Sequence, residues 1–368
     1  MSQSYIIAAK RSAVVPVNGA FAHLELHEIA APVIRACLAA CGLAPEEVGE
    51  LITGNALGAG GNPARLCALA AGLPEHVAGL SIDRQCASGL DALALADAMI
   101  CSGQADIVLA GGTESYSRRP VRARTFADGR PPLPYDQARF TPWPDRDPDM
   151  HVAADALAVN LGITRAAQDA WAVQSHDRAL RARHRLAHEL IGVEGVTQDP
   201  FTRALSARLC ARSRAITGTI TPANTSVAAD GAAFCTVVSE KVARRLDAPA
   251  VAIIGGCTLG GRPDLPGLAP VAAIRKLLCD AGIAPDHLAV AEIMEAYAAQ
   301  AIACVSESGL DPEIVNPGGG SLARGHPIGA SGAINAVRLY HELTARGGTG
   351  IAAIAAAGGI GTALLLRS

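Results

Sequence analysis

Residues 86–112, CASGLDALALADAMICSGQADIVLAGG, contain the pattern that decides the fold. After Cys86 the apolar spacing predicts a helix over residues 87–102, and a short apolar run predicts a buried strand over 106–110. Residues 329–359, GASGAINAVRLYHELTARGGTGIAAIAAAGG, repeat this arrangement near the end of the chain. Each stretch therefore predicts a helix that leads into a strand ending at a pair of glycines.

Three landmarks recur in the same order with nearly the same separation. The Ala-Ser-Gly tripeptides begin at 87 and 330, the glycine pairs at 111 and 358, and the Ala-Pro pairs at 44 and 284. The separations are 243, 247 and 240 residues. Since only two copies fit into the chain, the repeat indicates duplication of one α/β unit and not a solenoid.

The region before residue 86 alternates between strand and helix patterns. We expect strands over 5–10 and 48–53, helices over 22–41 and 63–71, and an extended segment over 77–84. This alternation predicts a wound α/β sheet. With 368 residues, the chain is long enough for two or three domain-sized units.

Composition excludes several classes of protein. The 31 basic and 34 acidic residues leave a net charge of −3, which argues against nucleic-acid binding. The most apolar stretch, 350–366, is interrupted by glycines and is too short for a membrane helix. The ten cysteines are scattered without a CxxC pair, so neither a disulfide framework nor a zinc ribbon is expected. We predict a soluble α/β protein of a reducing compartment, the cytoplasm.

Residues 117–150 interrupt the α/β pattern with seven prolines and seven arginines. This is too long for a simple connection. Helices are predicted over 151–190, with an arginine cluster at 178–185. His184 and His188 have the spacing of metal ligands on a helix, but no third ligand is apparent. A solvated helix face explains them better, and no metal site is predicted.

Two residues are candidates for nucleophilic chemistry. Cys86 precedes a predicted helix, whose positive end lowers a thiol pKa; the alternative is a small buried core cysteine. His326, in the glycine-rich segment 318–332, is placed to activate a thiol or else to shape the loop. The glycines at 358–361 allow a backbone N–H to help form an oxyanion hole, or they form a tight hairpin turn.

Taken together, these motifs resemble the thiolase family over nearly the whole chain. The matching stretches are 62–65 (NPAR), 84–90 (RQCASGL), 111–115 (GGTES), 218–221 (GTIT) with Asn224 and Ser226, 295–300 (EAYAAQ) and 325–332 (GHPIGASG). The resemblance is weakest over 117–150 and 195–215.

The resemblance implies two pseudo-duplicated halves in five αβαβα layers, with a loop domain inserted in the first half. The expected division is 1–116 plus 228–248 for the N-terminal half, 117–227 for the loop domain and 249–368 for the C-terminal half. It also implies a homodimer or homotetramer that uses acyl-CoA thioesters and has no tightly bound cofactor.

By position in the family, Cys86 is the nucleophile and His326 activates it. The backbone N–H groups of Cys86 and Ala357 then form the oxyanion hole, and His151 and Ser226 lie near the pantetheine of coenzyme A. The arginine cluster at 178–185 either meets the CoA phosphates or, as we weigh higher, forms a solvated face.

Two family residues are replaced in this chain. Ala355 stands where thiolases have their second catalytic cysteine, and Met294 stands where they have the asparagine that holds an enolate-stabilising water. The cysteine of a related branch is also missing, because its place is taken by Ala296. Acid–base catalysis is worth roughly 10²–10⁴-fold and an oxyanion-hole donor about 10²–10³-fold. Claisen condensation should therefore lose roughly 10⁴–10⁷-fold, whereas acylation of Cys86 needs neither group.

We therefore predict an acyltransferase that loads Cys86 from acyl-CoA or an acyl carrier protein. The acceptor is an amine, an alcohol, water or an already activated carbanion, in a pocket lined by Tyr135, Phe140 and Trp143 unless these pack in the core. Three alternatives stay open. The first is an ordinary thiolase in which Cys257 or Cys304 replaces the lost base. The others are a decarboxylative condensing enzyme and a non-catalytic subunit.

Overall fold

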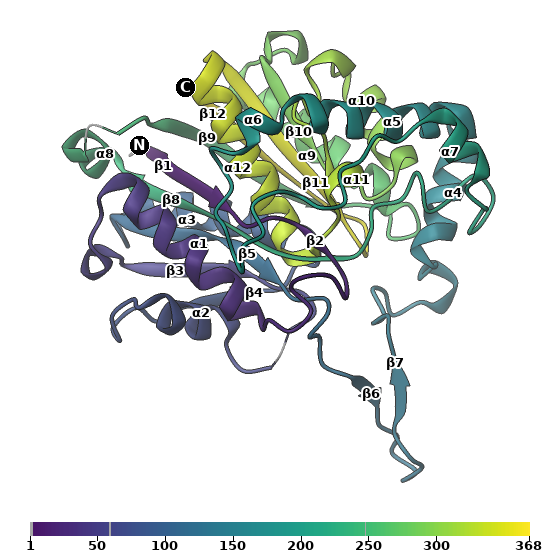
Figure 1. Cartoon of the computed structure of the whole chain (residues 1–368), viewed down its shortest axis with the longest axis horizontal. Coiled ribbons are helices and arrows are strands. Elements are labelled where there is room, and N and C mark those ends of the chain that lie inside the picture. Colours follow the sequence, from purple (N-terminus) through teal and green to yellow (C-terminus); the bar gives the residue numbers. More distant parts are fainter. Residues whose placement is uncertain (1–2, 59, 247) are drawn as a thin grey trace.

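The computed structural model describes residues 3–58, 60–246 and 248–368. Positions 1, 2, 59 and 247 of the predicted N-terminal half lie outside these described residues. The main strands are hydrogen-bonded in the order β10-β11-β12-β9-β1-β8-β5-β3-β4, with β2 on β8 (Figure 1). They are β1 (Ser4–Arg11), β2 (Val15–Pro16), β3 (Glu50–Gly54), β4 (Leu80–Ile82), β5 (Ile107–Glu114), β8 (Ala229–Ser239), β9 (Val251–Gly260), β10 (Val290–Ile293), β11 (Thr349–Ala356) and β12 (Ile360–Arg367).

The two halves of this sheet have the same topology, which confirms the duplication. In the first half β3 is parallel to β5, β5 is antiparallel to β8, and β8 is antiparallel to β1. In the second half β10, β11, β12 and β9 follow one another with the same directions. The halves join where Tyr5 and Ile6 of β1 pair with Ala252 and Val251 of β9.

Helices separate and cover the two halves. They are α1 (Leu26–Cys41), α2 (Pro63–Ala71), α3 (Ser88–Cys101), α4 (Met150–Asn160), α5 (Arg165–Arg181), α6 (Arg183–Leu186), α7 (Ala207–Arg212), α8 (Glu240–Leu246), α9 (Ala269–Ala281), α10 (Ala298–Ser308), α11 (Ser321–Arg324) and α12 (Ile328–Arg346). The central pair, α3 and α12, pack against each other and contact strands of both halves. Outside them, α1 and α2 cover the first half and α9 and α10 the second, which gives the expected αβαβα layers.

Local signals explain where these helices begin and end. Asn62 caps α2 by accepting a hydrogen bond from the backbone N–H of Arg65, and Pro63 occupies the first helical position. Gly72, with φ 81°, ends the same helix in the left-handed conformation that glycine adopts most easily. The structure therefore reproduces the predicted helix over 63–71.

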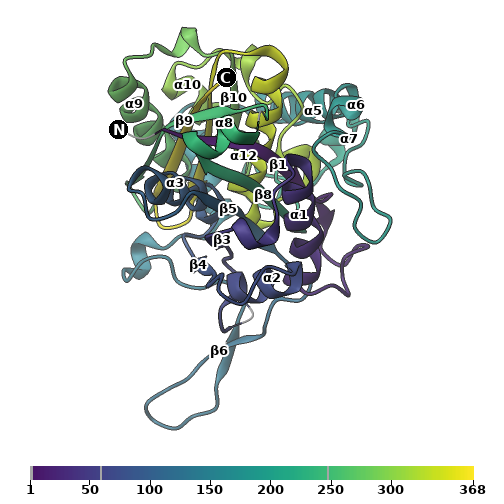
Figure 2. The same ribbon diagram turned by 90° about the vertical axis from the view of Figure 1, so that its left-hand side faces the viewer.

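The segment between β5 and β8 of the first half forms a hairpin and a helical region. The hairpin strands β6 (Arg122–Arg124) and β7 (Leu133–Tyr135) project away from the layered body (Figures 1 and 2). The following helices α4 and α5 pack on α10, and α5 also packs on α11. The predicted interruption at 117–150 thus contains a short sheet of its own.

One detail of the predicted strands is wrong. Strand β5 continues through the glycine pair to Glu114, because Gly111 and Gly112 allow close approach of Phe234 and of the start of α12. The apolar stretch 350–366 is divided between β11 and β12, which pair with each other across a turn. In the part of the chain that the structure describes, no helix is long and apolar enough to cross a membrane.

The arginine cluster is largely the solvated face that we weighed higher, because Arg181, Arg183 and Arg185 are exposed; Arg178 is the partly buried exception. Helix α6 ends at Leu186, so His188 lies beyond the helix that contains His184. Arg178 donates to the carbonyls of Pro312 and Val315 in the C-terminal half. Among the cluster, Arg181 is exposed at 79 % of its side-chain surface.

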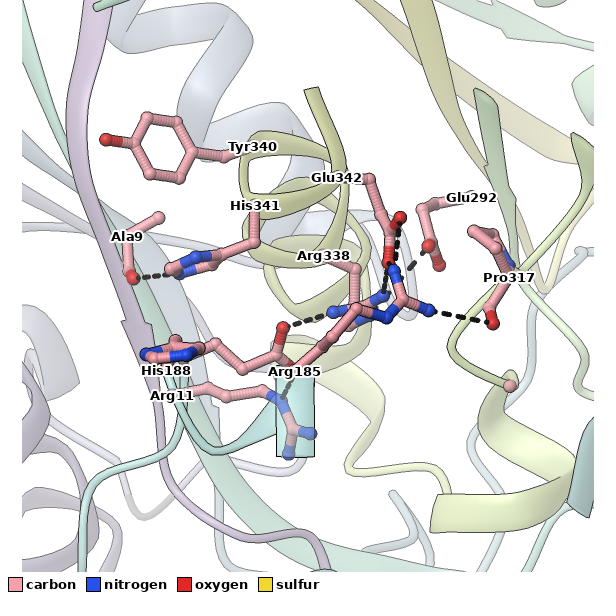
Figure 3. Close-up of polar contacts among 12 residues, drawn as sticks. Ala9, Arg11, Arg185, His188, Glu292, Pro317, Arg338, Tyr340, His341 and Glu342 are labelled. Carbon is pink, nitrogen blue, oxygen red and sulfur yellow. Dashed lines mark hydrogen bonds and ion pairs between the residues drawn. The ribbon is translucent and has the colours of Figure 1, made fainter. Parts of the chain in front are cut away.

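A buried network of charges joins α12 to the crossing segment around residue 189 (Figure 3). Glu189 accepts from Arg11 and from Arg338, while Glu342 pairs with Arg338 and with Arg185. Burial alone would raise the pKa of Glu189, but the neighbouring guanidinium groups of Arg338 and Arg11 lower this pKa to about 2. These buried charges are paired, as low-dielectric burial requires.

Candidate active site

Cys86, the candidate nucleophile, lies in a tight turn between β4 and α3. Gln85 has φ 53°, a left-handed conformation that residues other than glycine seldom adopt. Asp83 accepts from the backbone N–H of Gln85 at 2.9 Å. The Ser88 hydroxyl accepts from Arg84 N and donates to Gln85 O, both at 2.7 Å. These local bonds stabilise the turn that places Cys86 just before α3.

His326 reaches Cys86 from the other half of the molecule. Its Nε2 lies 3.2 Å from Cys86 Sγ, and its Nδ1 lies 2.7 Å from Ser331 Oγ. The backbone N–H of His326 donates to Val227 O at 2.8 Å. When Nδ1–H donates to Ser331, Nε2 keeps its lone pair for the thiol proton. The structure thus brings together the two residues that the sequence identified.

Glycines of the repeated tripeptides make this meeting possible. A Cβ added to Gly89 of α3 would lie 2.7 Å from Gly329 O and 2.8 Å from Ala333 N of α12. A Cβ added to Gly332 would lie 2.6 Å from Leu90 N. All three distances are too short for a real side chain, so glycine is required for the two helix starts to pack directly together.

Electrostatics show that the resting pair is neutral. Burial, with Glu114 and Asp83 nearby, raises the pKa of Cys86 to about 12. Burial lowers the pKa of His326 to about 4. The predicted lowering of the thiol pKa is therefore wrong, because loss of solvation outweighs the helix end.

Glu114 connects the site to two neighbouring elements, a role that sequence reasoning missed. Its buried carboxylate accepts from Ala56 N and Gly329 N at 3.0 Å, and from Asn55 Nδ2 at 2.7 Å. Burial raises the pKa of Glu114 to about 7, although these hydrogen bonds oppose the shift. The carboxylate thereby fixes the start of α12 relative to the loop at Asn55.

One pocket of about 420 Å³ contains most of the predicted site. Its lining includes Cys86, His326, His151, Ser226, Ala355, Ala357 and Phe140. Ala357 lies in the β11–β12 turn, where Gly358 and Gly359 have φ 80° and 79°. The glycines thus form a hairpin turn that borders the same pocket as Cys86, and the oxyanion hole stays a prediction.

Several other candidates lie outside this lining. Met294 is only 1 % exposed, packs in the core and accepts a hydrogen bond from Ser321 Oγ. Cys304 is buried in α10, and Cys257 packs with the core of the C-terminal half. Tyr135 lines a separate cleft beside the hairpin, and Trp143 is 52 % exposed. Only Phe140 of the three predicted aromatic residues borders the pocket that contains Cys86.

The far wall of the pocket contains a polar pair from two elements. Tyr297 Oη lies 3.2 Å from His151 Nδ1, with the rings edge to face at a centroid distance of 5.6 Å. Ser226 beside them donates from its N–H to Ala296 O at 3.0 Å and from its hydroxyl to Glu295 O. The sequence pointed to His151 and Ser226 but gave no role to Tyr297, whose partner is 146 residues away.

Comparisons with known proteins agree with this geometry. The family models "Thiolase, N-terminal domain" and "Thiolase, C-terminal domain" match residues 4–241 and 248–368. YhfS of Bacillus subtilis (strain 168), provisionally named an acetyl-CoA C-acetyltransferase, is 40 % identical over 98 % of each chain. An acetyl-CoA acetyltransferase of Cupriavidus necator is 36 % identical over 100 % of each chain. The crystal structure of the Bacillus anthracis acetyl-CoA acetyltransferase matches this chain with a TM-score of 0.93 and 34 % sequence identity. The match covers 100 % of this chain and 99 % of that one.

Proposed function

Because this chain belongs to the thiolase family and is an acyltransferase, we propose that it transfers acyl groups through a thioester on Cys86. The observation that carries this proposal is the 3.2 Å separation between Cys86 Sγ and His326 Nε2 in a pocket open to substrate. A nucleophile in reach of a base is the arrangement that covalent acyl transfer requires.

In the first half-reaction, the Cys86 sulfur attacks the carbonyl of an acyl-CoA thioester while its proton moves to His326 Nε2. The backbone N–H groups of Cys86 and Ala357 stabilise the negative oxygen of the tetrahedral intermediate. The bond to the CoA sulfur then breaks, and the proton on His326 passes to the departing thiolate. Acyl-Cys86, free CoA and a neutral imidazole result. His151 and Ser226 are the residues that would contact the pantetheine.

The second half-reaction is where we expect a difference from other thiolases. Among the described residues that line the pocket, Cys86 is the only cysteine, and Ala355 offers no proton-carrying group. Acceptors that need no strong base, such as an amine, an alcohol, water or an already activated carbanion, fit this site. The donor is an acyl-CoA or an acyl carrier protein. The three-part domain division, a homodimer or homotetramer and a cytoplasmic location stay predictions.

A second candidate function is ordinary acetyl-CoA acetyltransferase activity, which the names of the full-length relatives favour. It would require another group to remove the proton from the acceptor carbon. Cys257 and Cys304, which do not line the pocket, are poor substitutes. Thiolysis of acetoacetyl-CoA by free CoA measures this activity directly, and turnover typical of an enzyme would favour it over the altered second half.

The proposal is tested by the mass of the intact protein after incubation with a panel of acyl-CoAs. We expect one acyl group on the wild type and none on Cys86→Ala. The exposed Cys279 offers a matched control: Cys279→Ala should still gain the acyl group. Acylation that persists in Cys86→Ala, or folded wild type that gains no acyl group from any CoA or carrier-protein donor, would overturn the proposal.

A further inference from the structure

We infer that the Tyr297 hydroxyl, held by His151, donates a hydrogen bond to an anionic oxygen of the acceptor, so that the acceptor is an enolate or another oxyanion-bearing carbon nucleophile. This inference rests on the proposed acyl transfer through Cys86, and it names the class of acceptor. The motif at 294–297 reads Met-Glu-Ala-Tyr, whereas the motif that the resemblance implies there, which begins with the asparagine named above, is Asn-Glu-Ala-Phe. The chain has thus lost a polar group at one position and gained one three residues later.

The hydroxyl lies where an acceptor must bind. Tyr297 lines the same pocket as Cys86, His326 and Ala355. Most of its surroundings there are apolar, including Ala154, Leu157 and Ala296. A hydroxyl in such a wall needs a polar partner, because an unpaired one is costly to bury. His151 is the partner that the structure shows, and a bound oxyanion would be a second.

The Tyr297 hydroxyl is suited to donate a hydrogen bond while it keeps its proton. Burial, with the carboxylate of Asp149 and the sulfur of Cys86 nearby, raises the pKa of Tyr297 well above its usual range. The phenol therefore stays neutral and keeps its O–H. A neutral donor aimed at a developing negative oxygen in an apolar site is the arrangement that stabilises enolates and tetrahedral intermediates.

His151 determines how that O–H is directed. Its ring stands edge to face with Tyr297, and Nδ1 is 3.2 Å from Oη. The tautomer with Nδ1–H donates to Oη and leaves the phenol proton free to point into the pocket. When Tyr297 Oη accepts this hydrogen bond, the Tyr297 O–H also becomes a stronger donor. His151 is therefore a positioning residue for Tyr297, besides its proximity to the pantetheine.

Met294 explains why the substitution at 297 matters. Its side chain is buried below the pocket and accepts from Ser321, so it cannot hold a water at the acceptor oxygen. Tyr297 supplies a direct donor from the same short segment. The pocket then retains stabilisation of the acceptor oxygen while it lacks the base at position 355. An acceptor that arrives as a carbanion, formed by loss of another group or by a separate enzyme, meets both conditions.

The test uses acetoacetyl-CoA, whose enolate absorbs in the near ultraviolet and is distinguishable from the keto form. The protein is Cys86→Ala, in which thiolysis is blocked and only binding is observed. We expect saturating enzyme to shift the bound keto–enolate equilibrium toward the enolate. Tyr297→Phe in that background should reduce the enolate-to-keto ratio about tenfold or more, on the scale of a lost oxyanion donor.

Controls separate a specific role from a structural one. Tyr340→Phe removes a buried hydroxyl that donates to Ile7 O and Pro249 O, away from the pocket, and should leave the enolate ratio unchanged. The loss in Tyr297→Phe must exceed any change in affinity for CoA alone. His151→Gln should lower the enolate ratio, and the double variant with Tyr297→Phe should be no worse than Tyr297→Phe, because the two residues act as one unit.

An unchanged enolate ratio in Tyr297→Phe, or a loss matched by an equal loss of CoA binding, overturns the inference. This outcome is independent of the acylation experiment, which uses the intact nucleophile. If Cys86 is acylated but the enolate ratio does not respond, the proposed function stands and Tyr297 has no such role. If the ratio responds but Cys86 never accepts an acyl group, the acyl transfer fails instead.

Discussion

The central helices α3 and α12 are copies of one element, yet the residues before their starts and along their bodies differ in chemical character. With the offset of 243 residues between the Ala-Ser-Gly tripeptides, Cys86 corresponds to Gly329, and His326 corresponds to Asp83. The nucleophile and its base thus come from non-equivalent positions of the two copies. The two similar turns lie close together, and each contributes one half of the proposed catalytic pair.

The bodies of the two helices differ as well. Arg338 and Glu342 of α12 correspond to Leu95 and Met99 of α3, which pack against the apolar core. The charged pair is present only where the segment around Glu189 crosses α12 (Figure 3). The difference teaches that these charges lie where the segment around Glu189 packs on α12, while the equivalent positions of α3 are apolar.

The largest expected effect comes from removing His326, the proposed base, whose equivalent before α3 is Asp83. His326→Gln should slow acylation of Cys86 by roughly 10²–10⁴-fold, because the thiol would have no group to take its proton. The rate is measured by time-resolved intact mass with an acyl-CoA that loads the wild type. Asp83→Asn, at the equivalent position of the other copy, should change the rate by less than about tenfold. Equal losses in the two variants would contradict the division of labour.

The pH dependence of Cys86 tests whether the pair is neutral. With the pKa of His326 near 4 and that of Cys86 near 12, the reactive neutral pair persists between these values. We expect the rate of acylation, or of alkylation by iodoacetamide, to be nearly flat from about pH 5 to 10. Below about pH 4 it should fall about tenfold per unit as His326 becomes protonated. A steep rise between pH 6 and 9, as an exposed thiol shows, would contradict the neutral pair.

These two predictions mark the limit of what the sequence reveals. The repeat and the order of strands and helices follow from motifs that are local in the chain. The pairing of Cys86 with His326, 240 residues apart, was implied by the resemblance to the thiolase family. The pKa of Cys86 follows from neither, because it depends on how much protein surrounds the sulfur after folding. Glu114 and Tyr297 were missed because neither a motif nor the resemblance linked them to their distant partners, Gly329 and His151.

The two glycines of the repeat should be equally intolerant of a side chain. Gly89→Ala and Gly332→Ala each force a Cβ against the backbone of the facing helix, at a cost of roughly 1–3 kcal/mol in the free energy of unfolding. Denaturant unfolding followed by circular dichroism measures this cost. Gly260→Ala is the matched control, because its Cβ would meet nothing within 4 Å. A loss for one repeat glycine alone would show that the contact is not symmetric.

The smallest expected effect comes from removing Arg185, which pairs with Glu342 of α12. Arg185 is about half exposed and binds Glu342, which Arg338 and Arg346 also contact. Because Glu342 keeps two partners, Arg185→Ala should cost only about 1 kcal/mol of unfolding free energy, less at high salt. Arg181→Ala, whose side chain is 79 % exposed, should cost close to nothing. If Arg185→Ala were as neutral as Arg181→Ala, the crossing segment would be held by Glu189 and its arginines without help from Arg185.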